Sequence, residues 1–181
     1  MVYKNIINMA MTLLETTRLI EFVASKMPNI NSVVETENIY DLNNDNVNVE
    51  YSAFCLQQQQ HNSDIEGFIT YNFNLYYIDR LTLNKANKLE VQSSGITILQ
   101  NIINVIRERN YVSDIRSTSF VTFTEQFTAN CAGVYCSIAI TTQNLSLCAD
   151  EGIYKFDFND DFNKDFLTYM SATDLSIYDA Q

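Results

Sequence analysis

The segment at residues 68–78 constrains the fold of this chain most, because its side chains alternate between two kinds. Every second position is apolar or aromatic, and these positions are Ile69, Tyr71, Phe73, Leu75 and Tyr77. The positions between them are more polar and comprise Thr70, Asn72, Asn74 and Tyr76. A period of two places the two sets on opposite faces of a β-strand. The segment therefore predicts a strand of a sheet that is covered by helices on one side.

Two segments have the periodicity of amphipathic helices. Residues 4–27 repeat apolar or small side chains at spacings of three and four, and Pro28 ends the pattern. The stripe consists of Ile6, Ala10, Leu13, Thr17, Ile20, Ala24 and Met27, widened by Ile7 and Leu14. Residues 84–109 form the second helix, with Asn84 as its N-cap. Its stripe consists of Leu89, Ile96, Leu99, Ile103 and Ile106, widened by Ile102.

Both stripes are expected to pack on the apolar face of the 68–78 strand. The predicted core contacts join Leu13, Ile20, Leu99 and Ile103 to Tyr71, Phe73 and Leu75. Gly95 lies within the second helix, where glycine is unfavourable, and so indicates a close approach to a strand.

Shorter period-two patterns predict the remaining strands. They lie at residues 32–35, 38–42, 49–56, 117–128 and 132–142, the first two as edge elements. The last two are expected to form a hairpin with Asn130 and Gly133 in or near its turn. Residues 57–66 read as a polar loop in which His61 is a solvated side chain without partners.

The element order is thus α-β-β-β-α-β-β, which predicts an α+β fold. Two helices would pack on one face of a mostly antiparallel sheet, because this arrangement buries both stripes. With 181 residues the chain is long enough for one domain with a substantial core. We expect that domain to span residues 1–149, followed by a different kind of segment.

Residues 150–181 are acidic and aromatic and have no sustained period. They contain eight acids against Lys155 and Lys164, which makes their net charge −6. Their candidate partner-docking residues are Phe156, Phe158, Phe162, Phe166 and Tyr169. A solvated tail does not need these aromatics, whereas an arm laid on a neighbouring protein does. The alternative is a C-terminal helix folded back on its own domain.

The overall charge disfavours nucleic-acid binding and membrane insertion. The chain has 11 basic and 22 acidic residues, and a protein that holds DNA needs many basic residues to neutralise phosphates. Asn8, Glu15, Arg18 and Glu21 interrupt the apolar stretch near the N-terminus, so it predicts neither a signal peptide nor a membrane span.

No catalytic, cofactor-binding or metal-binding motif is apparent in the sequence. There is no glycine-rich phosphate loop, no nucleophile elbow and only one histidine. Four aspartates near residue 160 fit a solvated acidic face better than a calcium loop, and they are Asp157, Asp160, Asp161 and Asp165. We therefore expect no enzyme activity, although a small enzyme using Cys131 or Cys136 is the weakest of three hypotheses.

The cysteines are expected to be reduced and free of zinc. Cys55, Cys131, Cys136 and Cys148 include no Cys-x-x-Cys pair. Cys136 lies in an alternating apolar run and is expected to be a buried thiol. Cys131 and Cys136 could lie near each other across a hairpin turn. Reduced thiols indicate assembly inside a cell.

Two segments carry a resemblance to a known group of proteins. They are residues 68–103, FITYNFNLYYIDRLTLNKANKLEVQSSGITILQNII, and residues 120–140, FVTFTEQFTANCAGVYCSIAI. The chain resembles small virion proteins of tailed bacteriophages, in particular the neck and tail ring proteins of crAss-like phages. Its matching positions in the first segment are Tyr77, Asp79, Arg80, Asn87, Gln92, Ser93, Leu99, Asn101, Ile102 and Ile103. Those in the second are Phe123, Thr124, Phe127, Cys131, Ala132, Gly133 and Tyr135.

The resemblance implies a structural protein of the virion, assembled in the cytoplasm of the host bacterium. Its element order looks like that of tail-terminator and head–tail connector proteins, which form rings. The implied partners are copies of the same chain and portal, neck or tail proteins, with DNA passing through the ring without sequence-specific binding. The alternative is a soluble interaction or virion accessory module whose acidic tail captures a protein partner.

Overall fold

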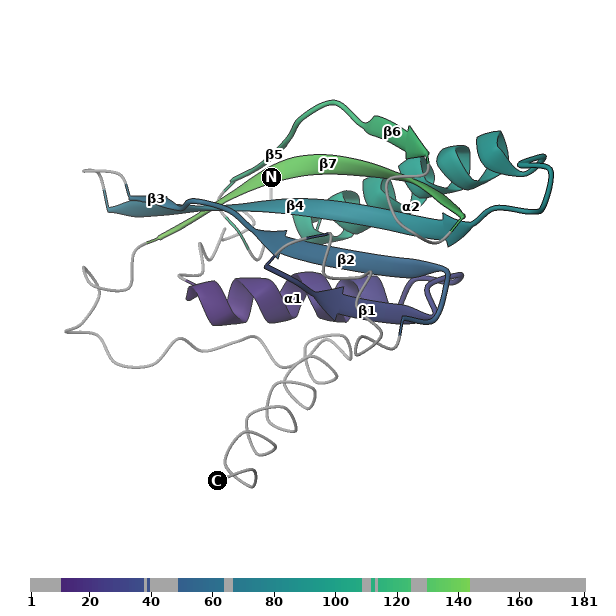
Figure 1. Ribbon diagram of the computed structural model, residues 1–181. Coiled ribbons are helices and arrows are strands. Elements are labelled where there is room, and N and C mark those ends of the chain that lie inside the picture. Colours follow the sequence, from purple (N-terminus) through teal and green to yellow (C-terminus); the bar gives the residue numbers. More distant parts are fainter. Residues whose placement is uncertain are drawn as a thin grey trace, which may run out of the picture.

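The chain folds into an α+β domain with two helices on a mixed, mostly antiparallel sheet (Figure 1). The structure, a computed structural model, describes residues 11–37, 39, 49–63, 67–108, 112, 114–124 and 130–143. Within these ranges the elements are α1 (Leu13–Ser25), β1 (Ser32–Glu35), β2 (Ala53–Gln58), β3 (Asn62–Ser63), β4 (Phe68–Arg80), α2 (Lys88–Glu108), β5 (Asp114–Ser117), β6 (Val121–Thr124) and β7 (Cys131–Gln143). The expected fold class and the approximate order of elements are confirmed.

The sheet is built around its two longest strands. Its strand order is β1-β2-β4-β7-β5, with β3 also paired to β4 and β6 also paired to β7. Strands β4 and β7 pair in antiparallel register along their full lengths, from Phe68 opposite Gln143 to Arg80 opposite Cys131. Among the described pairings only that between β1 and β2 is parallel. Strand β1 lies at an edge, as its sequence predicted.

A capping box starts helix α1. The Thr12 hydroxyl accepts the Glu15 N–H at 3.2 Å, and the Glu15 carboxylate accepts the Thr12 N–H at 2.7 Å. The helix ends at Ser25, shortly before Pro28. Leu14 was expected in the buried stripe, but it is 48% exposed. The expected first part of this helix, before Met11, lies outside the described residues.

Helix α2 begins later than its sequence predicted. Its first residue is Lys88, so Asn84 is not its N-cap. Asn87 precedes the helix, and its backbone carbonyl accepts the Val91 N–H at 2.9 Å. Leu89 was also expected in the buried stripe but is 78% exposed, because it lies in the first turn, at the end of the sheet.

Both helices contribute to one core on the same face of the sheet. Ile20, Leu99 and Ile103 are buried there and Leu13 is partly buried, as expected. The sheet residues of this core include the predicted apolar face of β4. A second, smaller cluster lies on the opposite face and contains Ile39, Ala53, Cys55, Tyr76, Ile78, Phe123 and Cys131.

Gly95 marks a close approach between helix and sheet, as predicted. A Cβ atom added there would lie 2.8 Å from Cδ1 of Tyr77 and 3.1 Å from Cγ2 of Val134. The missing side chain therefore lets α2 lie directly on β4 and β7.

Three strand predictions were wrong in detail. The expected strand at 49–56 begins only at Ala53 and continues to Gln58, and the expected loop at 57–66 also contains β3. The expected strand at 117–128 is two short strands, β5 and β6, on the same side of β7. Between them, residues 118–120 face only Cys136 and Ser137, so one extra residue shifts the register as in a β-bulge.

Gly133 lies inside β7, opposite Ile78, and not in a turn. A Cβ atom there would collide with the carbonyl oxygen of Tyr77 and lie 2.5 Å from Cζ of Phe123. The glycine therefore serves close packing within the sheet.

Candidate functional site

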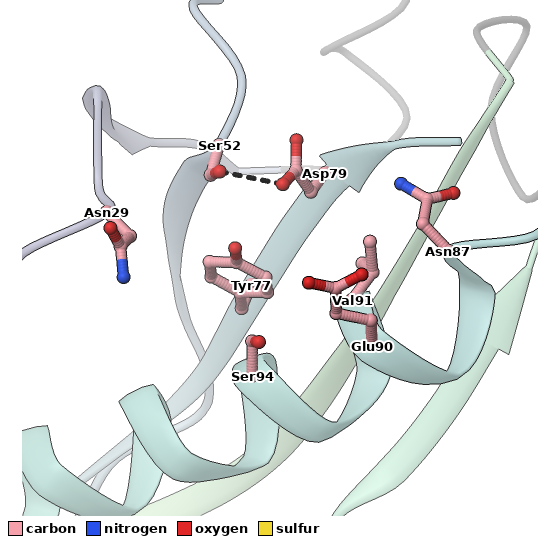
Figure 2. A pocket seen from close by; sticks show the side chains of 8 residues that line it. All are labelled: Asn29, Ser52, Tyr77, Asp79, Asn87, Glu90, Val91 and Ser94. Carbon is pink, nitrogen blue, oxygen red and sulfur yellow. Dashed lines mark hydrogen bonds between the residues drawn. The ribbon is translucent and has the colours of Figure 1, made fainter. Parts of the chain in front are cut away.

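A polar recess of about 360 Å³ lies where β2 and β4 meet the start of α2 (Figure 2). It brings together residues from four separate parts of the chain: Asn29, Ser52, Tyr77, Asp79, Asn87, Glu90, Val91 and Ser94. Ser52 and Asp79 come from neighbouring strand ends, and the last four residues come from the start of α2.

Hydrogen bonds hold the two strand ends of the recess. The Ser52 hydroxyl donates to Oδ2 of Asp79 at 2.8 Å, and Oδ1 of Asp79 accepts the Arg80 N–H at 2.7 Å. The Tyr77 ring forms the floor of the recess, between Asp79 and helix α2 (Figure 2). Tyr77 is only 2% exposed. Burial raises the pKa of the Tyr77 phenol, and the neighbouring Asp79 carboxylate acts in the same direction. The phenol therefore keeps its proton at neutral pH.

Local structure explains how the rim is formed. Asn29 follows Pro28 and has a φ of 73°, a left-handed conformation that asparagine tolerates. Asn87 is held by its own side chain, whose Oδ1 accepts the Thr82 N–H at 2.9 Å and whose Nδ2 donates to the Arg80 carbonyl at 3.0 Å. Both rim residues are thus positioned by turns of the backbone.

The lining suits a cationic or donor-rich group better than it suits nucleophilic catalysis. Two carboxylates face the recess, and none of its eight lining residues is a Lys, Arg, His or Cys. Carboxylates bind ammonium and guanidinium groups through charge-assisted hydrogen bonds. Ser52 is paired with a carboxylate alone, without the histidine that usually activates a serine.

The sequence did not point to this recess. Asp79 and Asn87 were singled out only through the resemblance, and Asn29, Ser52, Glu90 and Ser94 were not singled out at all. No local pattern could have found them, because strand pairing and the docking of α2 bring them together.

Cys131 and Cys136 do not lie near each other across a turn, which corrects that expectation. Both belong to β7, five residues apart, and they point to opposite faces of the sheet. Burial raises the pKa of the Cys136 thiol to about 12, as it does for Cys55. Burial also raises the pKa of Cys131. Such thiols are poor nucleophiles at neutral pH.

Cys55, Cys131 and Cys136 are free and buried, and Cys148 lies outside the described residues. We expect the native Cys148→Ser variant to react with a thiol reagent at pH 7 at least about a hundredfold more slowly than the same variant in denaturant. The reason is that a rise in pKa from 9.0 to about 12 lowers the thiolate fraction roughly a thousandfold. Absorbance after reaction with an aromatic disulfide measures this rate. Rapid reaction of three thiols in the native variant would contradict their burial. Fewer than four reactive thiols in the unfolded wild-type chain would contradict the expectation that all four cysteines are reduced.

His61 has partners, contrary to the expectation of a solvated side chain. Its Nδ1 accepts the Asn72 N–H at 3.2 Å, and its ring lies edge-on to the Tyr71 ring at 5.4 Å. Burial lowers the pKa of the His61 imidazole. The strand pairing of β3 with β4 creates this environment, which no pattern in a polar segment could reveal.

We expect a proton titration of the His61 ring, followed by NMR, to give a pKa below 6.5. The folded state then binds fewer protons than the unfolded state, so the contribution of neutral His61 to stability is present above pH 6.5. It is lost as the pH falls through the folded pKa, because a protonated Nδ1 cannot accept the Asn72 N–H. A measured pKa at or above 6.5 would show that the ring is solvated after all.

The five candidate docking residues Phe156, Phe158, Phe162, Phe166 and Tyr169 lie outside the described residues, as does the rest of the segment 144–181. Across the described ranges no group of three or more His, Cys, Asp or Glu side chains is placed to hold a metal ion. Neither α1 nor α2, the two described helices, is long and apolar enough to cross a membrane.

No family model matches the chain, and no curated protein sequence matches it.

Proposed function

We propose that this chain is a structural virion protein of a tailed bacteriophage. It assembles with copies of itself into a ring at the junction of portal, neck and tail, and DNA passes through that ring. The resemblance of residues 68–103 and 120–140 to neck and tail ring proteins motivates the proposal. In the fold these residues include β4, α2, β6 and most of β7, which are the central elements of the domain.

The observation that carries the proposal is the difference between the two ends of the sheet. At one end the turn between β4 and α2 exposes two large apolar side chains, Leu83 at 98% and Leu89 at 78%. At the other end β7 finishes at Gln143, and the acidic, aromatic segment comes later in the sequence. A closed ring needs two unlike, complementary surfaces on each subunit. The two ends of this sheet are unlike each other and are therefore suited to serve as such a pair of surfaces.

The edges of the sheet are less suited to self-association than its ends. The strands at the edges of the sheet are β1, β3, β5 and β6, of which β3 has two residues and the others have four each. Glu35 is exposed on β1, and Arg116 on β5 pairs with Asp114 at 2.7 Å. Short, charged edges hinder pairing with another strand. The ring contact is therefore assigned to the ends.

The charge of the chain supports passage of DNA without binding. Over the described residues nine acids stand against seven bases, so most of the net charge of −11 belongs to the remainder of the chain. An acidic surface repels the phosphate backbone and lowers its affinity for DNA.

Light scattering on the purified chain, combined with negative-stain imaging, tests the proposal. We expect discrete multimers with a central opening and no measurable affinity for duplex DNA near 0.15 M salt. A chain that stays monomeric at every concentration contradicts the ring. It would favour the accessory module that captures another protein through its acidic tail.

A further inference from the structure

We infer that the turn between β4 and α2, residues 81–89, is the docking site for the acidic C-terminal segment, residues 150–181, of a second copy of this chain. The inference rests on the proposed function and specifies which surfaces form the contact between neighbouring subunits. Three features of the turn and the segment lead to it: the order of the turn, its exposed apolar side chains and its charge.

The turn is held rigidly by hydrogen bonds. The Asn87 side chain ties the Thr82 N–H and the Arg80 carbonyl together, and the Lys85 N–H donates to the Thr82 carbonyl at 2.8 Å. The Lys88 N–H in turn donates to the Lys85 carbonyl at 3.1 Å. A surface that is already ordered loses little conformational entropy when a partner binds.

The rigid turn displays apolar side chains outward. Leu83 is almost fully exposed in the turn, and Leu89 is largely exposed in the first turn of α2. The turn itself projects beyond the end of β4 (Figure 1). Single exposed leucines are common on protein surfaces, but two on a fixed projection form an apolar contact point. Aromatic side chains such as Phe158 and Phe162 are suitable partners for such a point.

The charges of the two segments are complementary. Residues 81–89 contain two bases, Lys85 and Lys88, and no acid, in a chain with twice as many acids as bases. Arg80 precedes them, and the flanking acids Asp79 and Glu90 line the polar recess. The Arg80 guanidinium lies 5.0 Å from the centre of the Tyr51 ring, which helps to position it. Residues 150–181 carry a net charge of −6. Opposite charges guide the two surfaces toward each other and fix their register.

The ring proposed above, and not the length of the chain, selects a second copy as the occupant of the turn. Gln143 lies opposite Phe68, whereas the turn follows Arg80 at the other end of β4. Thirteen residues of strand separate these ends by about 40 Å. Phe156 comes thirteen residues after Gln143 and reaches at most about 45 Å from it. Phe158 and Phe162 come fifteen and nineteen residues after Gln143 and reach about 50 and 65 Å from it. The segment is therefore long enough for its own turn as well as for that of a neighbour, and the ring proposed above assigns it to the neighbour.

Sedimentation of the full-length chain and its variants tests the contact. The turn variant carries Lys85→Glu and Lys88→Glu, and the tail variant carries Asp160→Lys and Asp161→Lys. We expect each to associate at least about tenfold more weakly than wild type. Leu83→Ser should have an effect of the same size, because it removes the apolar contact without touching the core. Matched controls are Arg107→Glu, exposed near the far end of α2, and Leu14→Ser, exposed on α1, both of which should associate like wild type.

Mixing gives the sharpest test. The turn variant keeps an intact tail, and the tail variant keeps an intact turn. We therefore expect the two, each mainly monomeric alone, to form multimers again when they are mixed, because the unmodified tail fits the unmodified turn and the new lysines of one variant fit the new glutamates of the other. A chain with all four substitutions should again form multimers, because the charges are then exchanged.

The outcomes separate this inference from the proposed function. If wild type forms multimers and the turn variants associate equally well, the inference is wrong and the ring proposal stands. Another protein or DNA would then be the occupant of the turn. If wild type is monomeric, the proposed function fails and the inference fails with it, including the case in which the segment binds its own turn.

Discussion

Replacing Leu99 with alanine is expected to lower the free energy of unfolding by about 2–5 kcal/mol. Leu99 is fully buried in the middle of α2, within the core between the two helices and the sheet. Truncation removes apolar contacts and leaves a cavity that close-packed neighbours fill only in part. Urea unfolding followed by circular dichroism measures the change.

Leu89→Ala is the matched control for this prediction. It is the same substitution in the same helix, but the side chain is 78% exposed. We expect a change within about 0.5 kcal/mol, as for most surface substitutions. A loss below about 0.5 kcal/mol for Leu99→Ala as well would show that the core has been placed wrongly.

Replacing Gly133 with alanine is expected to cost about 3 kcal/mol or more. The new Cβ would collide with the carbonyl oxygen of Tyr77 and press on the Phe123 ring. A side chain can rotate away, but the carbonyl belongs to the ladder between β4 and β7, so relief requires the two central strands to separate. Thermal or urea unfolding of the variant tests this expectation.

Two comparisons make the Gly133 result specific. Ala139→Ser lies on the same face of β7 and should change stability by no more than about 0.5 kcal/mol. Adding Phe123→Leu to Gly133→Ala should not restore stability, because the main collision is with backbone. Full recovery in that double variant would show that the side-chain contact alone was limiting.

The central parts of the fold were predictable from the sequence because they depend on local periodicity. The alternation of apolar and polar residues along β4 predicted which of its side chains face the helices, although the neighbouring strands of β4 were not known. The stripe of α2 likewise placed Leu99 and Ile103 in the core. Gly95 was expected to touch a strand, and it does so at Tyr77.

Predictions failed where the deciding partner is distant in the sequence. The expected N-cap at Asn84 was wrong because Asn87 is bound to Arg80 and Thr82, which delays the start of α2. His61 was expected to be solvated, yet it is packed against β4. The polar recess could not be predicted, because it joins a loop, two strand ends and a helix start.

The sequence alone therefore determined which faces of β4, α1 and α2 are buried, since burial follows the period of each element and the period is written in consecutive residues. It also determined the contrast between the domain and the acidic segment after it, because charge and aromatic content depend only on composition. Tertiary structure decided the bulge between β5 and β6, the close contact of Gly133 with Tyr77 and Phe123 and the exposure of Leu83 and Leu89 at the end of the sheet. These features depend on how separate elements pack against each other. The local sequence pattern therefore does not show which of these side chains are buried and which are exposed.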